Sequence, residues 1–268
     1  MMRRFADKVV LVTGAARGQG RAEAIRFAQE GASIIAIDLC ADLRTTTYPG
    51  ATKADLEQTA RAIEAEGGRV VTAVADVRDF TALSQATREG VEQLGRLDVV
   101  VANAGMTTAA RSWEITAEQW QETIEINLTG VFHTAKATIP ILIDQGGGGS
   151  IVMISSVAGL RGLPLLSHYS AAKHGVVGLC RAMANELASY DIRVNSVHPF
   201  GVDTNLKVGE LFDLLEEEPH LGISFAPTLP YSKSDPEDIA NAVAWIASDE
   251  ARHVTGIQLP VDLGVITR

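Results

Sequence analysis

The sequence has little cysteine, few aromatic residues and no long apolar run. Cys40 and Cys180 are its only cysteines, and their separation matches neither a metal-binding pattern nor a disulfide framework. We therefore expect two reduced thiols, no metal site and a cytoplasmic location. Residues 1–5 include two arginines, but the apolar segment of a signal peptide does not follow, and no run is long enough to span a membrane.

Positive charge is also scarce. The chain has 23 Lys and Arg against 33 Asp and Glu, and this net charge of −10 argues against nucleic acid or an anionic membrane surface as a partner. Hydrophobic residues make up 46% of the chain and charged residues 21%, as in a globular protein with a sizeable core. The length fits one large α/β domain, residues 1–268.

The stretch from Val9 to Asp38 organises the rest of the chain. It has the pattern of a strand, a glycine turn, a helix and a second strand that ends in an acid. Gly14, Gly18 and Gly20 let the backbone turn sharply and approach a pyrophosphate, and the helix points its free N–H groups at that anion. Asp38 is placed to bind the adenosine ribose hydroxyls. Because all four parts agree, we interpret this stretch as a dinucleotide-binding βαβ unit rather than an ordinary turn.

Strand-like and helix-like segments alternate along the whole chain. We expect strands near 8–13, 33–38, 69–75, 97–102, 149–155, 191–197 and 257–261, and helices near 19–30, 53–66, 79–94, 117–143, 168–189, 208–217 and 236–248. The alternation predicts a Rossmann-type, doubly wound parallel sheet of about seven strands with helices on both faces. Ligands bind beyond the carboxyl ends of the strands in such sheets, so these ends are the places to search for chemistry.

Later strand ends offer further contacts for a dinucleotide. Asp76 either accepts a hydrogen bond from the adenine amino group, which we favour, or caps the next helix. Asn103 ends the fourth strand, where it either meets the ligand or bridges neighbouring strands, and small residues follow it. The segment 39–52, hereafter the insert, is long for a strand-to-helix connection. It is either a tolerated surface loop or a cover over the dinucleotide.

A candidate catalytic set follows the fifth strand. Ser156 ends that strand, and Tyr169 and Lys173 have the spacing that places both on one helix face. A free tyrosine titrates at about 10, and a neighbouring ammonium should lower that pKa. Tyr169 can then exchange a proton with an alcohol or carbonyl oxygen that Ser156 also contacts, while Lys173 holds the nicotinamide ribose. Asn127 is a poor helix former that can kink its predicted helix, fix a water and link Lys173 to solvent.

Four alternatives compete with this interpretation. A tyrosine and a lysine spaced like Tyr169 and Lys173 are commonly no more than a pair on a protein surface. Ser156 with Lys173 could instead belong to a hydrolase, although a hydrolase would leave the glycine pattern unexplained. A non-catalytic dinucleotide sensor or scaffold would be expected to lack the tyrosine or the lysine. A sugar-nucleotide epimerase would be expected to have another glycine spacing and an extended C-terminal substrate domain.

The motifs TGAARGQG (13–20), NAG (103–105) and YSAAK (169–173), together with Asn127 and Ser156, resemble those of the short-chain dehydrogenase/reductase superfamily over nearly the whole chain. The resemblance implies that Asn127, Ser156, Tyr169 and Lys173 form a catalytic tetrad acting on CH–OH groups. It also implies a homotetramer built on the helices of Asn127 and Tyr169 and on the C-terminal strand. The expected cofactor-binding residues are Gly14, Arg17, Gly18, Gln19, Gly20, Asp38, Leu39, Asp76, Val77, Asn103, Ala104, Gly105, Tyr169, Lys173, Pro199, Gly201, Val202 and Thr204.

Gln19, the insert and the segment HPFGVDT (198–204) resemble the carveol dehydrogenase-like, mycofactocin-associated subgroup. This resemblance implies an NAD that is held tightly, an insert that helps to bury it, and a redox peptide as electron acceptor. The superfamily more often has Pro-Gly directly, whereas Phe200 stands between Pro199 and Gly201 here. We therefore expect the backbone near the nicotinamide to differ locally.

The cofactor and the substrate follow from two further segments. The carboxylate of Asp38 should repel the extra phosphate of NADP, so we expect NAD, although Arg17 argues for NADP. Residues 204–236 are expected to form a lid, with Val202 and Thr204 on the nicotinamide carboxamide. The apolar residues of the lid indicate a hydrophobic secondary alcohol or ketone, unless its helix only packs on the body. Resemblance implies a terpenoid-like alcohol such as carveol, with a steroid or 3-oxoacyl-type ketone as the alternative. We expect residues 216–218, three glutamates, to be solvated.

Overall fold

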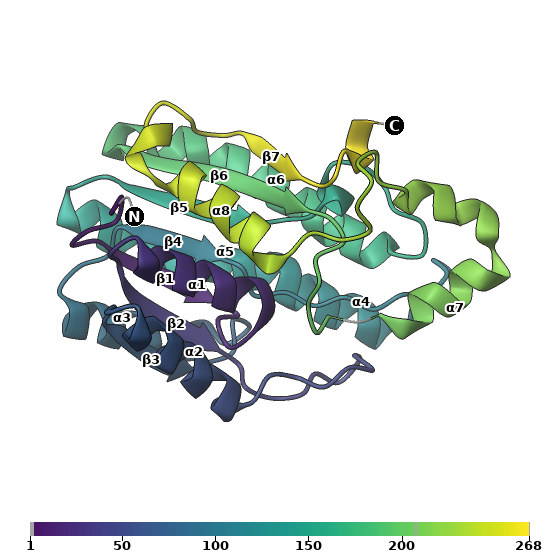
Figure 1. Ribbon diagram of the computed structural model, residues 1–268, viewed down its shortest axis with the longest axis horizontal. Helices are drawn as coiled ribbons and strands as arrows, with labels where there is room; N and C mark the ends of the chain where they lie inside the picture. The colour runs from purple at the N-terminus through teal and green to yellow at the C-terminus, as the bar shows by residue number, and fades with distance from the viewer. Residues whose placement is uncertain (1–2, 207, 268) are drawn as a thin grey trace.

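The computed structural model, which describes residues 3–206 and 208–267, contains a seven-stranded, all-parallel sheet in the order β3-β2-β1-β4-β5-β6-β7 (Figure 1). The strands are β1 (Val9–Thr13), β2 (Ser33–Asp38), β3 (Val70–Val74), β4 (Val99–Ala102), β5 (Gly149–Ile154), β6 (Ile192–Pro199) and β7 (Gln258–Val261). The predicted doubly wound fold is confirmed. The strand order reverses between β1 and β4, which is where sheets of this kind bind their ligands.

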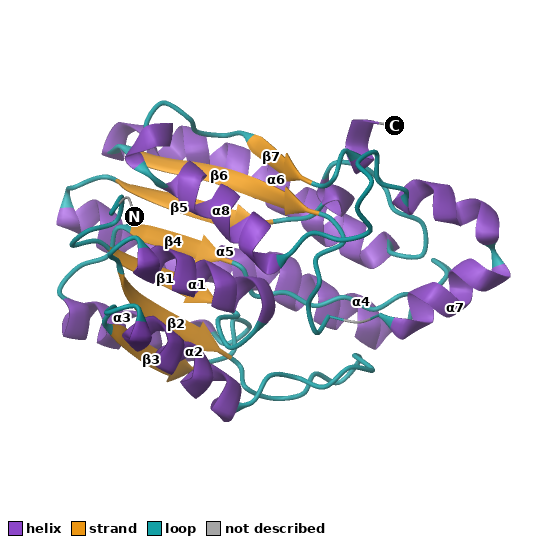
Figure 2. Cartoon of the chain, in the orientation of Figure 1, coloured by secondary structure: helices purple, strands orange, loops and turns teal. Residues whose placement is uncertain are grey.

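Helices cover both faces of the sheet (Figure 2). The α-helices are α1 (Gly18–Gln29), α2 (Lys53–Ala65), α3 (Phe80–Leu94), α4 (Ala117–Ile124), α5 (Gly130–Gln145), α6 (Ser167–Leu187), α7 (Gly209–Glu217) and α8 (Pro236–Ala247). One hydrophobic layer joins the sheet to α1, α2 and α8, and the other joins it to α3, α5 and α6. A parallel sheet covered in this way needs strands that are apolar on both faces. In β1, Val10 and Val12 enter the first layer while Val9 and Leu11 enter the second.

The single helix expected over 117–143 is interrupted. It is α4, then a π-helical turn (Glu125–Thr129), then α5. Asn127 is completely buried in that turn, and its side-chain Nδ2 donates to the carbonyl oxygens of Met106 (2.9 Å) and Thr123 (3.0 Å). Because the Asn127 amide bonds the carbonyl four residues before it, it competes with the regular helix ladder at that point. The expected distortion at Asn127 is therefore present, in the form of a π turn.

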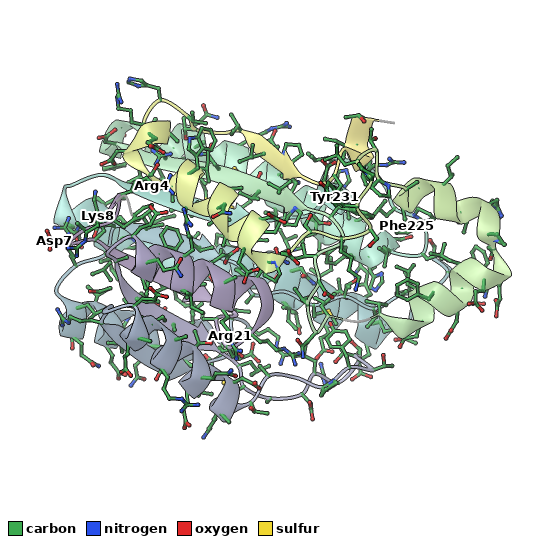
Figure 3. All side chains as sticks on the ribbon, viewed as in Figure 1. Arg4, Asp7, Lys8, Arg21, Phe225 and Tyr231 are labelled. Carbon is green, nitrogen blue, oxygen red and sulfur yellow. The ribbon has the colours of Figure 1, made fainter. Side chains whose placement is uncertain are left out.

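The insert and the segment 204–235 lie at the carboxyl end of the sheet. The second segment contains α7 and a 3₁₀ helix (Pro219–Phe225) that the sequence pattern did not predict. Figure 3 places Phe225 and Tyr231 at this end of the molecule, opposite Arg4, Asp7 and Lys8. Within the described residues, no helix combines the length and apolarity that crossing a membrane requires, and no group of three or more His, Cys, Asp or Glu side chains is arranged to hold a metal ion.

Glu23 is an exception to the apolar packing of α1. Its side chain is completely buried, and neither carboxylate oxygen has a hydrogen-bond partner among the described residues. Burial raises the pKa of this carboxyl group from 4.5 to about 8. Glu23 is therefore mostly protonated at neutral pH, because a buried and unpaired carboxylate would be far more costly.

Candidate active site

The glycine turn between β1 and α1 has no space for side chains. A Cβ at Gly20 would lie 2.2 Å from the Gly14 carbonyl oxygen, and one at Gly14 would lie 2.9 Å from the Ala104 Cα. Gly14 and Gly18 also have positive φ angles, +70° and +56°. Thr204 packs beside this turn, because its Cγ2 is 3.3 Å from the position of a Cβ on Gly18. The turn therefore excludes side chains at Gly14 and Gly20, and among the described residues the buried Oε1 of Gln19, on the same helix end, has no hydrogen-bond partner.

Asn103 ties β4 to β1. Its Nδ2 donates to the carbonyl oxygens of Thr13 (2.9 Å) and Gly14 (3.3 Å), and the Thr13 hydroxyl oxygen accepts from the backbone N–H groups of Asn103 and Ala104. Of the two roles open to Asn103 from the sequence, the bridge between strands is thus the observed one. These bonds fix the glycine turn against the end of β4.

Asp38 lies where β2 ends and the insert begins. Its Oδ2 accepts from the backbone N–H of Ala16 (3.0 Å), and its Oδ1 accepts from that of Cys40 (2.9 Å). The carboxylate, which is 9% exposed, is therefore held between the glycine turn and the insert. Leu39 follows it directly and is half-buried.

Arg17 is engaged by the insert. Its Nη2 donates to the Pro49 carbonyl oxygen (2.6 Å), and its Nη1 donates to that of Gly50 (3.1 Å). These bonds occupy the guanidinium that, from the sequence alone, argued for the extra phosphate of NADP. The charge of Arg17 anchors the insert to the glycine turn instead.

Asp76 does not cap α3. Asp79 does so, with its carboxylate accepting from the backbone N–H groups of Thr81 and Ala82. Asp76 pairs with Arg78 (Nη2–Oδ2, 2.7 Å), and Arg78 also donates to Glu122 on α4 (3.0 Å). The capping alternative is therefore wrong, and Asp76 belongs to an ion-pair network at the end of β3.

Val77 turns its side chain into the core. Its Cγ2 lies 2.5 Å from where a Cβ on Gly130 would be, and its carbonyl oxygen is 2.9 Å from His133 Nδ1. These contacts direct the side chain and the carbonyl of Val77 toward α5. A role for Val77 at the cofactor stays a prediction.

Ser156, Tyr169 and Lys173 converge beyond the end of β5. The side chains of Ser156 and Tyr169 are hydrogen-bonded to each other, and the Lys173 Nζ lies 5.6 Å from the centre of the Tyr169 ring. Lys173 is 2% exposed, and its Nζ donates to the Ile154 carbonyl oxygen (2.9 Å). A Cβ on Gly105 would lie 2.9 Å from Asn127 Oδ1 and 3.6 Å from Lys173 Nζ, so all four predicted catalytic residues meet at one place.

Burial dominates the electrostatics of this group. It raises the pKa of Tyr169 to about 12, against the opposing effect of the Ser156 hydrogen bond, and it lowers the pKa of Lys173 to about 7. The expectation that Lys173 gives Tyr169 a lowered pKa is therefore wrong, because burial raises that pKa instead. Two buried side chains each lose water, and the lysine points its ammonium at a backbone carbonyl.

His198 was not predicted from the sequence to take part in the site. This residue is completely buried, its Nδ1 donates to the Ser156 carbonyl oxygen (2.7 Å), and its Nε2 is 2.9 Å from the Ser196 hydroxyl oxygen. Burial lowers the pKa of His198 to about 4, so the ring is neutral at physiological pH. The available signal was a histidine at the end of a predicted strand, just before Pro199.

The end of β6 leads toward the site through Gly201, whose φ is +57°. The Phe200 N–H donates to the Val261 carbonyl oxygen (3.3 Å), and Val202 pairs with Ser234 in an isolated parallel bridge. Phe200 therefore adds one residue between Pro199 and Gly201, and its backbone hydrogen bond to Val261 keeps the chain attached to β7 at this point. Thr204 follows and reaches the glycine turn, as described above.

An apolar cluster, hereafter the apolar wall, surrounds Tyr169. It brings together six parts of the chain and consists of Tyr48, Ala109, Val157, Ala158, Leu163, Leu166, Tyr169, Phe200, Val208, Leu211, Leu214, Phe225 and Ile266. The insert, α7 and the C-terminal residues all reach it. No sequence periodicity connects these segments.

Arg111 joins α7 to the body of the protein. Its Nη2 lies 2.6 Å from a Glu217 carboxylate oxygen, and its Nε lies 2.8 Å from one of Glu218. Glu216 and Glu217 are exposed, as expected for a solvated run of charge, and Glu218 is half-buried; the structure adds that Glu217 and Glu218 both pair with Arg111. Their charge was visible in the sequence, but their partner about a hundred residues earlier was not.

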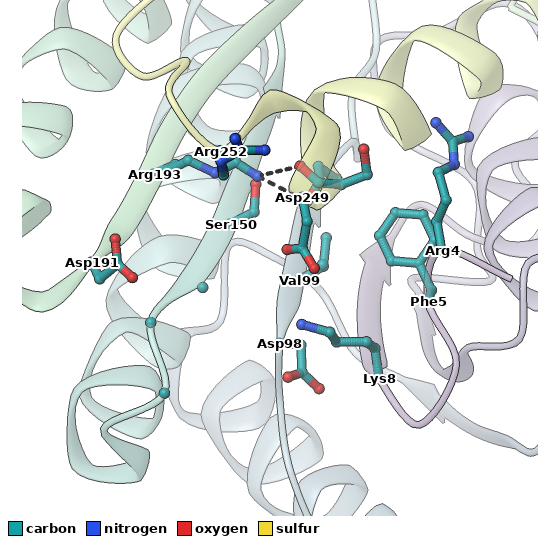
Figure 4. Close-up of a pocket in the computed structure, with 15 residues that line it drawn as sticks. Arg4, Phe5, Lys8, Asp98, Val99, Ser150, Asp191, Arg193, Asp249 and Arg252 are labelled. Atoms are coloured by element: carbon teal, nitrogen blue, oxygen red, sulfur yellow. Dashed lines mark hydrogen bonds between the residues drawn. The ribbon is translucent and has the colours of Figure 1, made fainter.

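A cavity of about 120 Å³ lies at the opposite end of the sheet (Figure 4). Charged residues of both signs line it, including Arg4, Lys8, Asp98 and Arg193. It sits at the amino ends of β4 and β5, so it is remote from Tyr169. The cavity is therefore separate from the group formed by Ser156, Tyr169 and Lys173.

Residues 8–211 match the family model for short chain dehydrogenases. The chain belongs to this family, and is thus an oxidoreductase. It is 43% identical to (−)-trans-carveol dehydrogenase of Rhodococcus erythropolis, over 98% of this chain and 99% of that protein.

Two solved structures are also similar. A short chain dehydrogenase from Mycobacterium paratuberculosis bound to NAD has a TM-score of 0.96 and 45% identity, covering 99% of this chain and 100% of that one. Carveol dehydrogenase from Mycobacterium avium in complex with NAD has a TM-score of 0.94 and 48% identity, covering 99% of both. These structures therefore share the fold over 99% of this chain, and the family model covers residues 8–211.

Proposed function

We propose that this protein is an NAD-dependent dehydrogenase that interconverts a hydrophobic secondary alcohol and its ketone, with a terpenoid-like alcohol such as carveol as the substrate type. The observation that carries the proposal is the meeting of Ser156, Tyr169 and Lys173 beside the apolar wall. The polar side chains can contact the reacting oxygen of the substrate, and the apolar wall can pack against the rest of a hydrophobic substrate. The similarity to two carveol dehydrogenases supports the same substrate type.

The cofactor is NAD, and the residues present fit it. The bare glycine turn at Gly14, Gly18 and Gly20 leaves the backbone open to a pyrophosphate. Asp38 presents a carboxylate for ribose hydroxyls, and the guanidinium of Arg17 is bound to the insert rather than free for a 2′-phosphate. Both NAD-bound relatives support this choice. The other proposed contacts are Gln19, Leu39, Asp76, Val77, Asn103, Ala104, Gly105, Tyr169, Lys173, Pro199, Gly201, Val202 and Thr204.

Bound NAD supplies the acceptor or donor of hydride. Tyr169 holds the proton that the substrate oxygen gains in reduction and gives up in oxidation. Ser156 hydrogen-bonds that oxygen as its charge changes, and His198 fixes the Ser156 backbone from behind. Lys173, with a pKa of about 7, can take up or release a proton at neutral pH and so serves as a relay partner for Tyr169. Asn127 holds the Met106 backbone beside this group.

Tyr169→Phe tests the proposal. It removes one oxygen, and turnover of carveol should fall by about 10²-fold or more because the proton has no carrier. NADH affinity, measured by its fluorescence on binding, should stay close to that of the wild type. Unchanged turnover would remove Tyr169 from the reaction. Unchanged NADH binding with no turnover by the wild type on any alcohol would favour the sensor or scaffold alternative.

We further propose that NAD stays bound between turnovers and that a redox peptide accepts the electrons. The support is the insert, which is tied to the glycine turn by Arg17 and to α4 by Glu122. The test is to denature the purified protein, identify any released dinucleotide, and supply carveol with free NAD or with an electron-accepting dye. Co-purified NAD and turnover with dye alone support the proposal. An empty protein that reduces free NAD steadily would make it an ordinary exchanging dehydrogenase.

The remaining proposals concern substrate range and assembly. Residues 204–236 act as a lid, and a steroid and a 3-oxoacyl thioester should be poorer substrates than carveol in parallel assays. A cytoplasmic homotetramer is proposed, supported by the exposed Trp120 and Phe132 on α4 and α5. Light scattering that reports a monomer at working concentration would refute the assembly.

A further inference from the structure

The insert is fastened at two points. At its middle, the Thr45 backbone N–H and hydroxyl donate to Glu122 Oε2 (2.9 and 2.7 Å), and this glutamate is completely buried on α4. Near its end, Arg17 grips the Pro49 and Gly50 carbonyls. A segment that is bonded at two points holds the residues between them in place. Tyr48 lies between these two anchors.

Tyr48 is the residue by which the insert reaches the apolar wall. Its hydroxyl accepts from the Thr107 N–H (3.2 Å) and donates to the Thr107 carbonyl oxygen (3.2 Å). Its ring packs on the same cluster as Tyr169, Phe200 and Leu211. Burial raises the pKa of Tyr48 to about 12, so this hydroxyl stays protonated and keeps both bonds.

Two side chains hydrogen-bond the backbone of consecutive residues in the loop after β4. Asn127 bonds both backbone groups of Met106, accepting from its N–H (3.1 Å) and donating to its carbonyl (2.9 Å). Tyr48 bonds both backbone groups of Thr107 in the same way. The π turn and the insert therefore fix one dipeptide from two sides. Tyr48 is also close enough to Tyr169 for charge on one ring to raise the pKa of the other, after the larger effect of burial.

We propose that Tyr48 is a specificity-determining residue, whose ring forms the insert's part of the surface against which the apolar body of the substrate packs. The inference rests on the proposed function. A tyrosine ring has only two side-chain torsions, and here its hydroxyl is fixed at two points, so it is a rigid surface. Rigid apolar surfaces favour substrates that fill them. Tyr48 thus selects alcohols whose reacting carbon lies in or beside a ring over short acyclic ones.

The test compares Tyr48→Ala, Tyr48→Leu and Tyr48→Phe with wild type on carveol and on 2-butanol. The ratio of kcat/KM between the two alcohols should fall by about tenfold or more in Tyr48→Ala, mainly through the KM for carveol, because an apolar surface that is lost no longer distinguishes size. Tyr48→Leu should fall between, and Tyr48→Phe should keep the ratio within about threefold. Tyr190→Ala, which removes a half-exposed tyrosine after α6, is the matched control and should keep it.

NADH binding, followed by fluorescence, and thermal unfolding are measured on every variant. Similar NADH affinity with a changed ratio supports the proposal. An unchanged ratio in Tyr48→Ala and Tyr48→Leu overturns it. A loss of NADH affinity that lowers activity on both alcohols equally also overturns it, because Tyr48 would then act on the cofactor side. If the wild type oxidises neither alcohol, the proposed function fails first. If it oxidises carveol and only the ratio fails to move, this inference alone falls.

Discussion

Replacing Glu23 by glutamine should stabilise the protein, and the gain should grow with pH. The Glu23 carboxyl group is completely buried in α1, and both its oxygens lack a partner among the described residues. Its pKa is raised by burial from 4.5 to about 8. Glutamine has nearly the same shape but carries no ionisable proton, so it isolates the effect of ionisation.

The magnitude follows from the difference between the two pKa values. Between pH 4.5 and 8 the native state keeps the proton of Glu23, whereas the unfolded chain releases it. The stabilising contribution of that proton is therefore complete below pH 4.5 and is lost as the pH rises through 8. At about 1.4 kcal/mol per pKa unit, wild type should lose on the order of 3 kcal/mol from this residue between pH 5 and pH 8. That is a large part of the stability of a typical domain.

Urea unfolding of wild type and Glu23→Gln at several pH values between 5 and 8 measures the effect. Other titrating groups cancel in the difference between the two proteins, so the difference should widen steadily with pH. Glu64→Gln, a change at an exposed glutamate on α2, should run parallel to wild type. Parallel curves for Glu23→Gln and wild type would refute the prediction, since Glu23 would then titrate in the native state as it does in the unfolded chain.

Three further results are expected. Carveol oxidation should speed up as the pH rises from 7 to 10, because Tyr169, with a pKa of about 12, must release its proton to act as a base. A flat pH–rate profile would contradict this prediction. His198→Phe should lower kcat while the affinity for NADH stays the same. It should also cost about 1–3 kcal/mol of stability, because the buried Ser156 carbonyl loses its hydrogen-bond donor. An unchanged kcat would exclude a positioning role for His198. Arg111→Gln should speed hydrogen exchange of the α7 amides with little change in Tm, because solvent-exposed ion pairs contribute little to global stability. Unchanged exchange would show that Glu217 and Glu218 do not hold α7.

The layered sheet was predictable because its signals are local. The central strands β1 and β4 are apolar runs buried along their whole length, and several helices begin at a cap that the sequence displays, such as Thr52 before α2 and Asp79 before α3. The same holds for Gly14 and Gly20, whose backbone positions exclude any side chain. Helix boundaries were less certain where tertiary bonds decide them, as in the π turn at Asn127.

The sequence alone determined the family, the fold and the nature of the cofactor, and it predicted that Ser156, Tyr169 and Lys173 share one site, because residue type and spacing carry these properties. Only the tertiary structure decided which charges are already paired, such as Arg17 with the insert and Arg111 with Glu217. It also decided the pKa of Tyr169, since burial depends on what other segments cover it. Tyr48 and His198 acquire their contacts from residues 59 and 42 positions away, and no local pattern records such distances.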